Sequence, residues 1–520
     1  MKKVVFESTK VLLGLIFCGV FVLLLLFTQC NYACRQSFLL PNFALFLIIL
    51  LLFAGFFALN RLYQTKMPQL KSNVISVDKI VYFSCLLLFF LQVYAAFNLY
   101  FETGWDPKAI MMYARTLMIE ECISPTYFSK YPNNLLFFFF EFYVFKFNSQ
   151  FGIFSGSQQV LSIILINYLL NALTCLLVYK TASLLTKKRY AFCAYLLAFL
   201  NLGLSPWSLI CYTDALGLIF PILTLYVFIR PAKHKWLSYA LSAIIGTIGY
   251  FLKPQCFILL IAVLIIELIY AFKDKSQIKP LLLSFLCIVV TFVAMKGGIN
   301  ALCARKNIVL DQEQSYSAAH FFMMGLNEET KGVFSADDMH YSGTFATKAE
   351  RTEANLQTAA SRIQNMGSLG LMKQLARKAL CLYNDGTYAW QMEGSFLDNV
   401  PEPPNTVTAP FLRSIYYPDG SRYLYFTTFE QFIWLMILLL GAAGLFSSFS
   451  HKHAKTLNIL WLTWIGLTVF ELLFEVRARY LYTNVPLFCV LAAVGIENIR
   501  RLFCRITEKL SARLPAKKSV

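Results

Sequence analysis

Long apolar runs dominate this chain and limit what it can fold into. A run of about 17–25 apolar residues is long enough to cross a lipid bilayer as a helix. We therefore predict an all-α polytopic membrane protein. Twelve expected spans lie near 10–28, 38–59, 80–100, 159–182, 190–206, 213–229, 236–252, 254–272, 279–297, 430–448, 456–474 and 480–498.

The composition excludes an ordinary soluble domain. Of the 520 residues, 58% are hydrophobic and only 14% are charged, whereas soluble domains carry about 25% charged residues. The 49 Phe and 28 Tyr fit a lipid-facing surface with aromatic belts at its two interfaces.

The basic residues indicate an orientation rather than a nucleic-acid partner. The net charge is +18, and 26 of the 46 Lys and Arg lie in short loops and tails that alternate along the chain. This is the positive-inside pattern of a membrane protein. It predicts a multi-pass protein of the cell membrane with both termini in the cytoplasm. Lys2 and Lys3 precede an apolar run that lacks a small-residue cleavage site, so we expect an uncleaved first span.

The 14 cysteines form no zinc-ligand spacing. Several lie inside apolar runs, where they act as small hydrophobic residues. Cys30 and Cys34 are close enough in a short outer loop for a disulfide, and the sequence leaves open whether they are bridged.

Two longer segments are expected outside the membrane and define the domains. Residues 1–78 form a two-span region, and 79–297 form a transmembrane core with an outer loop at 101–158. Within that loop, the aromatic run 135–147 predicts a helix lying along the outer leaflet. Residues 298–428 have ordinary globular composition and predict an extracytoplasmic α or α+β domain. Residues 429–520 form a three-span region with a basic cytoplasmic tail.

Two acidic residues, Glu102 and Asp106, follow the third expected span on its outer side. A carboxylate at that position can act as a general base that deprotonates an acceptor hydroxyl. The alternative is structural, because Asp106 before Pro107 also fits the N-cap of a helix.

Further polar residues stand at expected helix ends on the same side. Asp214 in Tyr212-Thr213-Asp214 is either a helix-start acid or a functional acid. Lys253 before Pro254 either reaches the lipid headgroups or binds an anionic lipid-linked substrate. Lys130, in the polar break 129–134, is either a loop residue or a contact to a lipid phosphate.

The densest group of charges lies before the last expected span. Glu471, Glu475, Arg477 and Arg479 interrupt two apolar runs, and Tyr480 follows them. Arginines on the outer side run against the positive-inside rule, which suggests that they have a function there. Phosphate binding is one such function, because the guanidinium group binds phosphate through two parallel hydrogen bonds. The alternative is a turn held by a salt bridge between Glu475 and an arginine.

Together these features resemble the GT-C superfamily of membrane glycosyltransferases, which use polyprenyl-phosphate-linked donors. The resemblance covers roughly 80–300 and 430–500 and rests on short motifs: the acidic outer loop, Tyr-Thr-Asp, Lys-Pro and Glu-x-Arg-x-Arg-Tyr. It implies a catalytic base at Asp106, with Glu102 as the other candidate because the two acids are four positions apart. It also implies a donor-phosphate site made of Lys253, Arg477, Arg479 and Tyr480. The residues that it implies as support for this site are Asp214, Tyr212, Lys130 and Glu475.

A narrower likeness concerns the segment from His320 to Trp390, which is similar to lipoteichoic-acid ligase-like proteins of Gram-positive bacteria. It makes His320 and Asp385 candidate acceptor-binding residues. The expected partners are a polyprenyl-linked glycan donor, a glycolipid or envelope polymer as acceptor, and membrane lipid, with no nucleic acid. We expect no cofactor and no metal, because the outer segments carry no Asp-x-Asp pair or ligand cluster.

Two other classes compete with the transferase. A transporter or flippase of lipid-linked glycans is the nearer one, but such proteins tend to show repeated halves, and no duplication is visible here. A structural membrane scaffold leaves the outer charges unexplained.

Overall fold

The computed structural model describes residues 14–15, 18–27, 36–66, 76–120, 122–403, 405–445 and 453–513. Cys30 and Cys34, the two cysteines of the possible disulfide, lie outside these residues.

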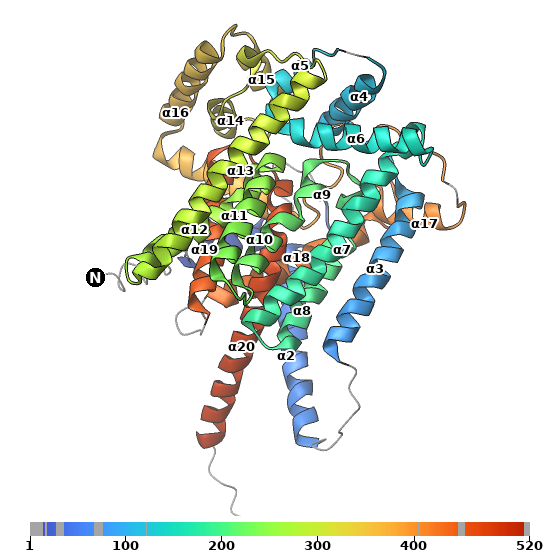
Figure 1. The fold of residues 1–520 in the computed structure, drawn as a ribbon. Coiled ribbons are helices and arrows are strands. Elements are labelled where there is room, and N and C mark those ends of the chain that lie inside the picture. The colour runs from blue at the N-terminus through green and yellow to red at the C-terminus, as the bar shows by residue number, and fades with distance from the viewer. Residues whose placement is uncertain are drawn as a thin grey trace, which may run out of the picture.

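Helices account for the architecture of the described chain (Figure 1). These residues form no strand, and their β pairing is limited to isolated bridges such as Glu102 with Asn399. The α+β alternative for 298–428 is therefore wrong for this part of the chain. The helices used below, besides the spans of the next paragraph, are α4 (Trp105–Ile119), α5 (Thr126–Lys130), α6 (Leu135–Phe151), α8 (Lys188–Ala198), α9 (Thr213–Gly217), α10 (Ile219–Ile229), α11 (Lys235–Leu252), α14 (Ala318–Gly325), α15 (Ala336–Gly343), α16 (Lys348–Tyr383) and α17 (Thr408–Tyr416).

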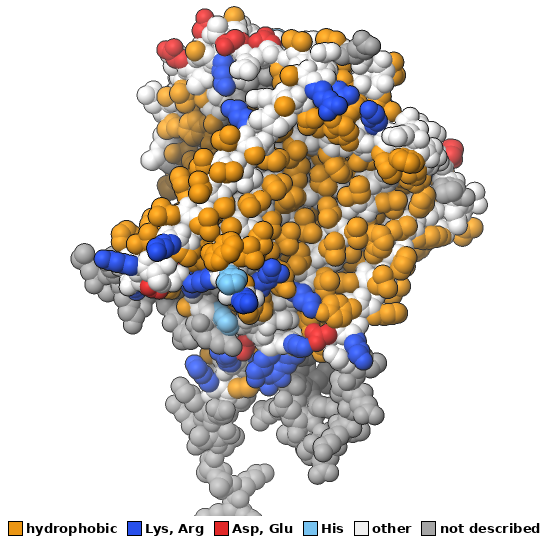
Figure 2. All heavy atoms as spheres, in the orientation of Figure 1, with side chains coloured by type: hydrophobic (Ala, Val, Ile, Leu, Met, Phe, Trp, Pro, Cys, Tyr) orange, Lys and Arg blue, Asp and Glu red, His pale blue; other side chains and the backbone are white. Residues whose placement is uncertain are grey.

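Six of the described helices are long and apolar enough to cross a membrane. Shorter apolar helices cover Asn42–Gly55, within α2 (Asn42–Lys66), and Thr213–Ile229. Figure 2 shows apolar side chains over a broad band of the visible face, with Lys and Arg gathered below it. The six helices that are long and apolar enough are α3 (Val77–Leu99), α7 (Val160–Leu185), α12 (Ile258–Ala271), α13 (Ile278–Arg305), α18 (Tyr423–Leu445) and α19 (Ala454–Leu473). Helices α7, α12 and α13 are each counted together with the turn before them.

The first predicted span, 10–28, lies partly outside the described residues. Where the structure describes them, the later spans lie mostly over helices, but two are less regular than expected. The segment 190–206 is α8 followed by a wider π turn, Phe199–Gly203. The segment 480–498 begins in a 3-10 helix, Ala478–Asn484, before α20 (Val485–Arg513). The total of twelve spans stays a prediction.

The helices α4–α6 and α14–α16 gather at one end of the molecule, and we call them the end layer (Figure 1). Helix α6 runs across the ends of several long helices, and its place along the outer leaflet stays a prediction. The predicted boundaries after residues 297 and 428 fall inside α13 and α18. Helix α16 is broken at Gly367, whose backbone is not helical.

The membrane helices pack closely where side chains are small. A side chain at Gly495 of α20 would overlap the carbonyl oxygen of Leu440 in α18, so these two helices are in backbone contact. Large rings fill the space beside them, with Trp464 and Phe488 stacked at 4.4 Å between ring centroids. This tight centre fixes the start of α20 and therefore the turn that precedes it.

Candidate functional site

Arg479 lies at the centre of a group of buried charges. It belongs to the 3-10 helix Ala478–Asn484 between α19 and α20 and is only 7% exposed. Its Nη1 donates to Asp214 at 3.2 Å, and its Nε donates to Glu393 at 3.0 Å. The guanidinium carbon lies 4.9 Å from the centroid of Trp105 and 4.8 Å from that of Tyr480. We call Asp106, Asp214, Lys253, Glu393, Glu475, Arg477 and Arg479 the charged cluster.

Asp214 and Lys253 form the deepest part of this cluster. Asp214 is in the first turn of α9 and is fully buried, and its carboxylate forms ion pairs with both Lys253 and Arg479. Lys253, between α11 and the next helical turn, is 5% exposed. The alternative in which Lys253 reaches the lipid headgroups is therefore wrong, because its ammonium group is turned inward to Asp214.

Asp106 faces the same cluster from the end layer. Its carboxylate accepts a hydrogen bond of 3.0 Å from the Tyr212 hydroxyl. Helix α4 begins one residue before Asp106, at Trp105, with Gly104 as N-cap and no side-chain cap. The capping interpretation of Asp106 is therefore wrong. Burial raises the pKa of this carboxyl group, while the nearby Arg479 and the Tyr212 hydrogen bond act in the opposite direction.

Glu475 and Arg477 complete the cluster on the loop after α19. The Nε of Arg477 lies 3.5 Å from the Glu393 carboxylate. Glu475 accepts a hydrogen bond of 3.1 Å from the Tyr480 hydroxyl, and burial raises its pKa. The salt bridges described for the two arginines run to Glu393 and Asp214. The charges of Arg479 and Arg477 oppose the rise in the pKa of Glu475, and a turn held by a Glu475–arginine salt bridge stays an alternative.

The end layer fixes the backbone that carries these arginines. The Nζ of Lys378, in α16, donates to the carbonyl oxygens of Leu472 and Phe474 at 2.6 Å each. The amide of Val476 donates to the carbonyl of Gly332 at 2.9 Å. Lys378 thus caps carbonyls at the end of α19 that have no partner within their own helix.

Sequence reasoning missed Glu393. This residue is 9% exposed and contacts both arginines of the cluster. It follows an irregular stretch in which Tyr388, Ala389 and Gln391 have left-handed backbones, with φ of 58°, 60° and 64°. One acid among many in a near-neutral segment carries no distinguishing pattern, so only its tertiary position reveals it.

Glu102 does not join the charged cluster. Its carboxylate accepts from Arg115 at 2.7 Å and from the Asn399 side chain at 3.0 Å. Its backbone pairs with Asn399 in an isolated bridge. Glu102 and Arg115 line a separate surface hollow of about 520 Å³. Of the two acids in the outer loop, the structure brings only Asp106 to the arginines.

The other candidate residues also lie elsewhere. His320 is fully buried, bonds Ser342 through Nδ1 at 2.7 Å and stacks on Tyr316, and burial lowers its pKa to about 4. Asp385 is 1% exposed and accepts from the amides of Thr387 and Ala389, closing a local turn. Lys130 accepts a backbone hydrogen bond from Tyr316.

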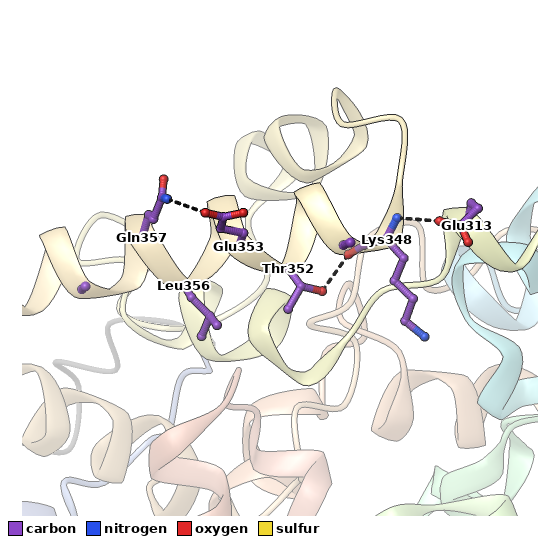
Figure 3. A pocket seen from close by; sticks show the side chains of 8 residues that line it. Glu313, Lys348, Thr352, Glu353, Leu356 and Gln357 are labelled. Carbon is purple, nitrogen blue, oxygen red and sulfur yellow. Dashed lines mark hydrogen bonds between the residues drawn. The ribbon is translucent and has the colours of Figure 1, made fainter.

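A larger hollow of about 870 Å³ opens beside the start of α16 (Figure 3). The Lys348 amide donates to Glu313 there, and Gln357 bonds Glu353. Its lining residues include none of the charged cluster. In the described residues no group of three or more His, Cys, Asp or Glu is arranged to hold a metal ion.

The fold and the site define a polytopic helical membrane protein with a buried charged cluster between its membrane helices and its end layer. The chain belongs to a family described as conserved hypothetical integral membrane protein, whose model matches residues 5–499. No curated protein matches the chain.

Proposed function

We propose that this protein is a membrane glycosyltransferase. It moves a sugar or glycan chain from a polyprenyl-(pyro)phosphate-linked donor to an acceptor of the cell envelope, such as a teichoic acid, a glycolipid or a wall polysaccharide. The observation that supports this most is the meeting of Asp106 with Arg479 in one cluster that also holds Lys253 and Arg477. The proposal includes twelve spans, cytoplasmic termini and a cluster on the outer face.

The donor would bind with its prenyl chain in lipid and its phosphate at the cations. Arg477 and Arg479 lie on the loop just beyond α19, and Lys253 lies just beyond α11. Both loops therefore sit at the ends of membrane helices, where the headgroup of a lipid-linked donor is expected. Positive charges placed there in advance stabilise the negative charge that develops on the leaving phosphate.

Asp106 would act as the general base. It removes the proton of an acceptor hydroxyl as that oxygen attacks the anomeric carbon, and the bond from that carbon to the phosphate oxygen breaks. The proton ends on Asp106 and the electron pair on the phosphate. A carboxyl group whose pKa is raised by burial is a better base than an ordinary one. The Tyr212 hydrogen bond holds the carboxylate in one orientation.

The test is Asp106→Asn, expressed in the source cells in place of the native chain. We expect normal membrane insertion, loss of the envelope glycan and accumulation of its lipid-linked donor on the outer leaflet. Accumulation on the inner leaflet would favour the flippase instead. Arg477→Ala should raise the donor concentration needed for half-maximal transfer.

Glu102→Gln is the matched control, because Glu102 is the neighbouring acid that lies outside the cluster. It should retain glycan transfer. Wild-type glycan levels in the Asp106→Asn cells would contradict the assignment of the base.

A further inference from the structure

The cations assigned to the donor phosphate already hold counter-ions in this structure. Glu393 contacts Arg477 and Arg479, and Asp214 contacts Arg479 and Lys253. All five of these residues are 9% exposed or less. A phosphate therefore contacts the Nε of either arginine or the Nη1 of Arg479 only when one of the two carboxylates leaves.

The two carboxylates differ in their freedom to leave. Asp214 is fully buried on α9, with Lys253 and Arg479 on either oxygen. Glu393 lies in a short irregular segment, and its neighbours Gly394 and Ser395 are exposed. Movement of Glu393 therefore needs only a short segment with exposed residues to shift, whereas movement of Asp214 needs a shift of α9, all of whose residues are buried.

The segment around Glu393 is fixed at both ends and distorted between them. Trp390 and Phe396 are buried and pack against each other at 4.9 Å between centroids. Ala389, just before Trp390, and Gln391, just after it, have left-handed backbones. Non-glycine residues adopt this conformation only when surrounding contacts impose it. The arginine contacts of Glu393 are contacts of that kind.

We propose, on the basis of the function proposed above, that Glu393 is the counter-ion that the donor phosphate replaces, and that it thereby selects for charge. A ligand with one negative charge exchanges one anion for another and gains little. A ligand with two or more negative charges keeps a surplus of attraction to the same arginines. Glu393 therefore raises the charge that a ligand needs in order to bind: pyrophosphate or dianionic phosphate binds with a net gain, whereas a monoanionic phosphodiester gains little.

The experiment uses the full-length protein in phosphatidylcholine nanodiscs, with inorganic pyrophosphate and the monoanion dimethyl phosphate as probes. Calorimetry measures the two affinities, and hydrogen exchange follows residues 388–396. In the wild type, pyrophosphate should bind more tightly than dimethyl phosphate and should increase exchange in this segment.

Glu393→Gln removes the charge but keeps the shape of the side chain. Exchange in 388–396 should then be high without any probe. Both probes should bind about tenfold more tightly, the ratio given by the loss of one charged contact that each has to displace. Glu402→Gln, an exposed acid of the following segment, is the matched control and should behave as the wild type. If Glu393→Gln does not fold, Glu393→Asp keeps the charge on a shorter side chain and should give intermediate exchange.

The outcomes separate this inference from the proposed reaction. Pyrophosphate that binds without any change in the exchange of 388–396 overturns the counter-ion role. Failure of pyrophosphate to bind either the wild type or Glu393→Gln overturns it together with the phosphate site. If pyrophosphate increases exchange in 388–396 while Asp106→Asn cells make normal glycan, the counter-ion role of Glu393 is supported and the proposed transferase reaction is contradicted.

Discussion

Arg479 donates a hydrogen bond of 3.2 Å to Asp214, a residue 265 positions earlier in the chain, and both side chains are buried. Removing one member of a buried ion pair leaves the other charge without compensation, at about 3–5 kcal/mol. We expect Arg479→Gln and Asp214→Asn each to lower the free energy of unfolding by that order.

The double variant tests whether this pair acts as a unit. The double variant takes one partner each from Lys253 and Glu393, but it leaves neither member of the Asp214–Arg479 pair facing an empty place, so it should be destabilised by less than the sum of the two single variants. Denaturant unfolding in detergent measures all three. Arg422→Gln, an exposed arginine, should change little, and strict additivity would contradict the coupling.

Tyr212→Phe should move the pH dependence of glycan transfer. The Tyr212 hydroxyl donates to the Asp106 carboxylate and favours its charged form. Without that hydrogen bond the pKa of Asp106 rises further, so the base becomes active only at higher pH. We expect the acidic limb of the rate profile to move to higher pH. Tyr425→Phe, at an exposed tyrosine, is the control. If the acidic limb of the rate profile does not move in Tyr212→Phe, Tyr212 does not influence the pKa of the base.

Lys378→Met should loosen the turn that carries the arginines. It leaves the carbonyls of Leu472 and Phe474 without their donor, at about 1–3 kcal/mol for each buried group. We expect a lower melting temperature and faster hydrogen exchange in residues 472–479. Lys373→Met, an exposed lysine on the same helix, should show neither effect. A normal exchange rate in Lys378→Met would show that other contacts hold the turn.

His320 should make the end layer sensitive to acid. Burial lowers its pKa to about 4, whereas an unfolded chain has a histidine pKa of about 6.5. Between these values the unfolded state binds more protons, so stability falls as the pH drops through the window, by at most about 1.4 kcal/mol per pH unit.

Hydrogen exchange of α14 and α16 at pH 7 and pH 4.5 measures this loss. His320→Gln should reduce the difference between the two pH values, and His340→Gln, at an exposed histidine, should not. An acid response that His320→Gln leaves unchanged would place its origin in other groups.

Much of the fold could be predicted because hydrophobic length is a strong local signal. The runs near 80–100 and 456–474 correspond to α3 and α19 within a few residues. The start of α4 was harder, since Asp106-Pro107 fits a helix start, whereas the helix begins at Trp105 with φ of 48°. That left-handed residue is imposed by tertiary contacts, which no local pattern records.

The candidate site was predictable only where its residues are exceptional for their surroundings. Asp214, Lys253 and Arg479 stand out because they lie at ends of apolar runs opposite to those that carry the many basic residues, and the structure brings them together. Glu393 does not stand out, because acids are common in its segment. Glu102 stands out as much as Asp106 does, yet Arg115 and Asn399 hold it elsewhere.

The ion pair between Asp214 and Lys253 has a consequence for how the protein is made. Lys253 follows Asp214 by only 39 positions, whereas Arg479 is synthesised near the end of the chain. An acid at the end of a membrane helix is costly to insert alone. Lys253 therefore compensates the charge of Asp214 as soon as α9, α10 and α11 have been made, long before the arginines emerge from the ribosome. Replacement of Lys253 by a neutral residue would thus make membrane insertion less favourable at an early stage of translation.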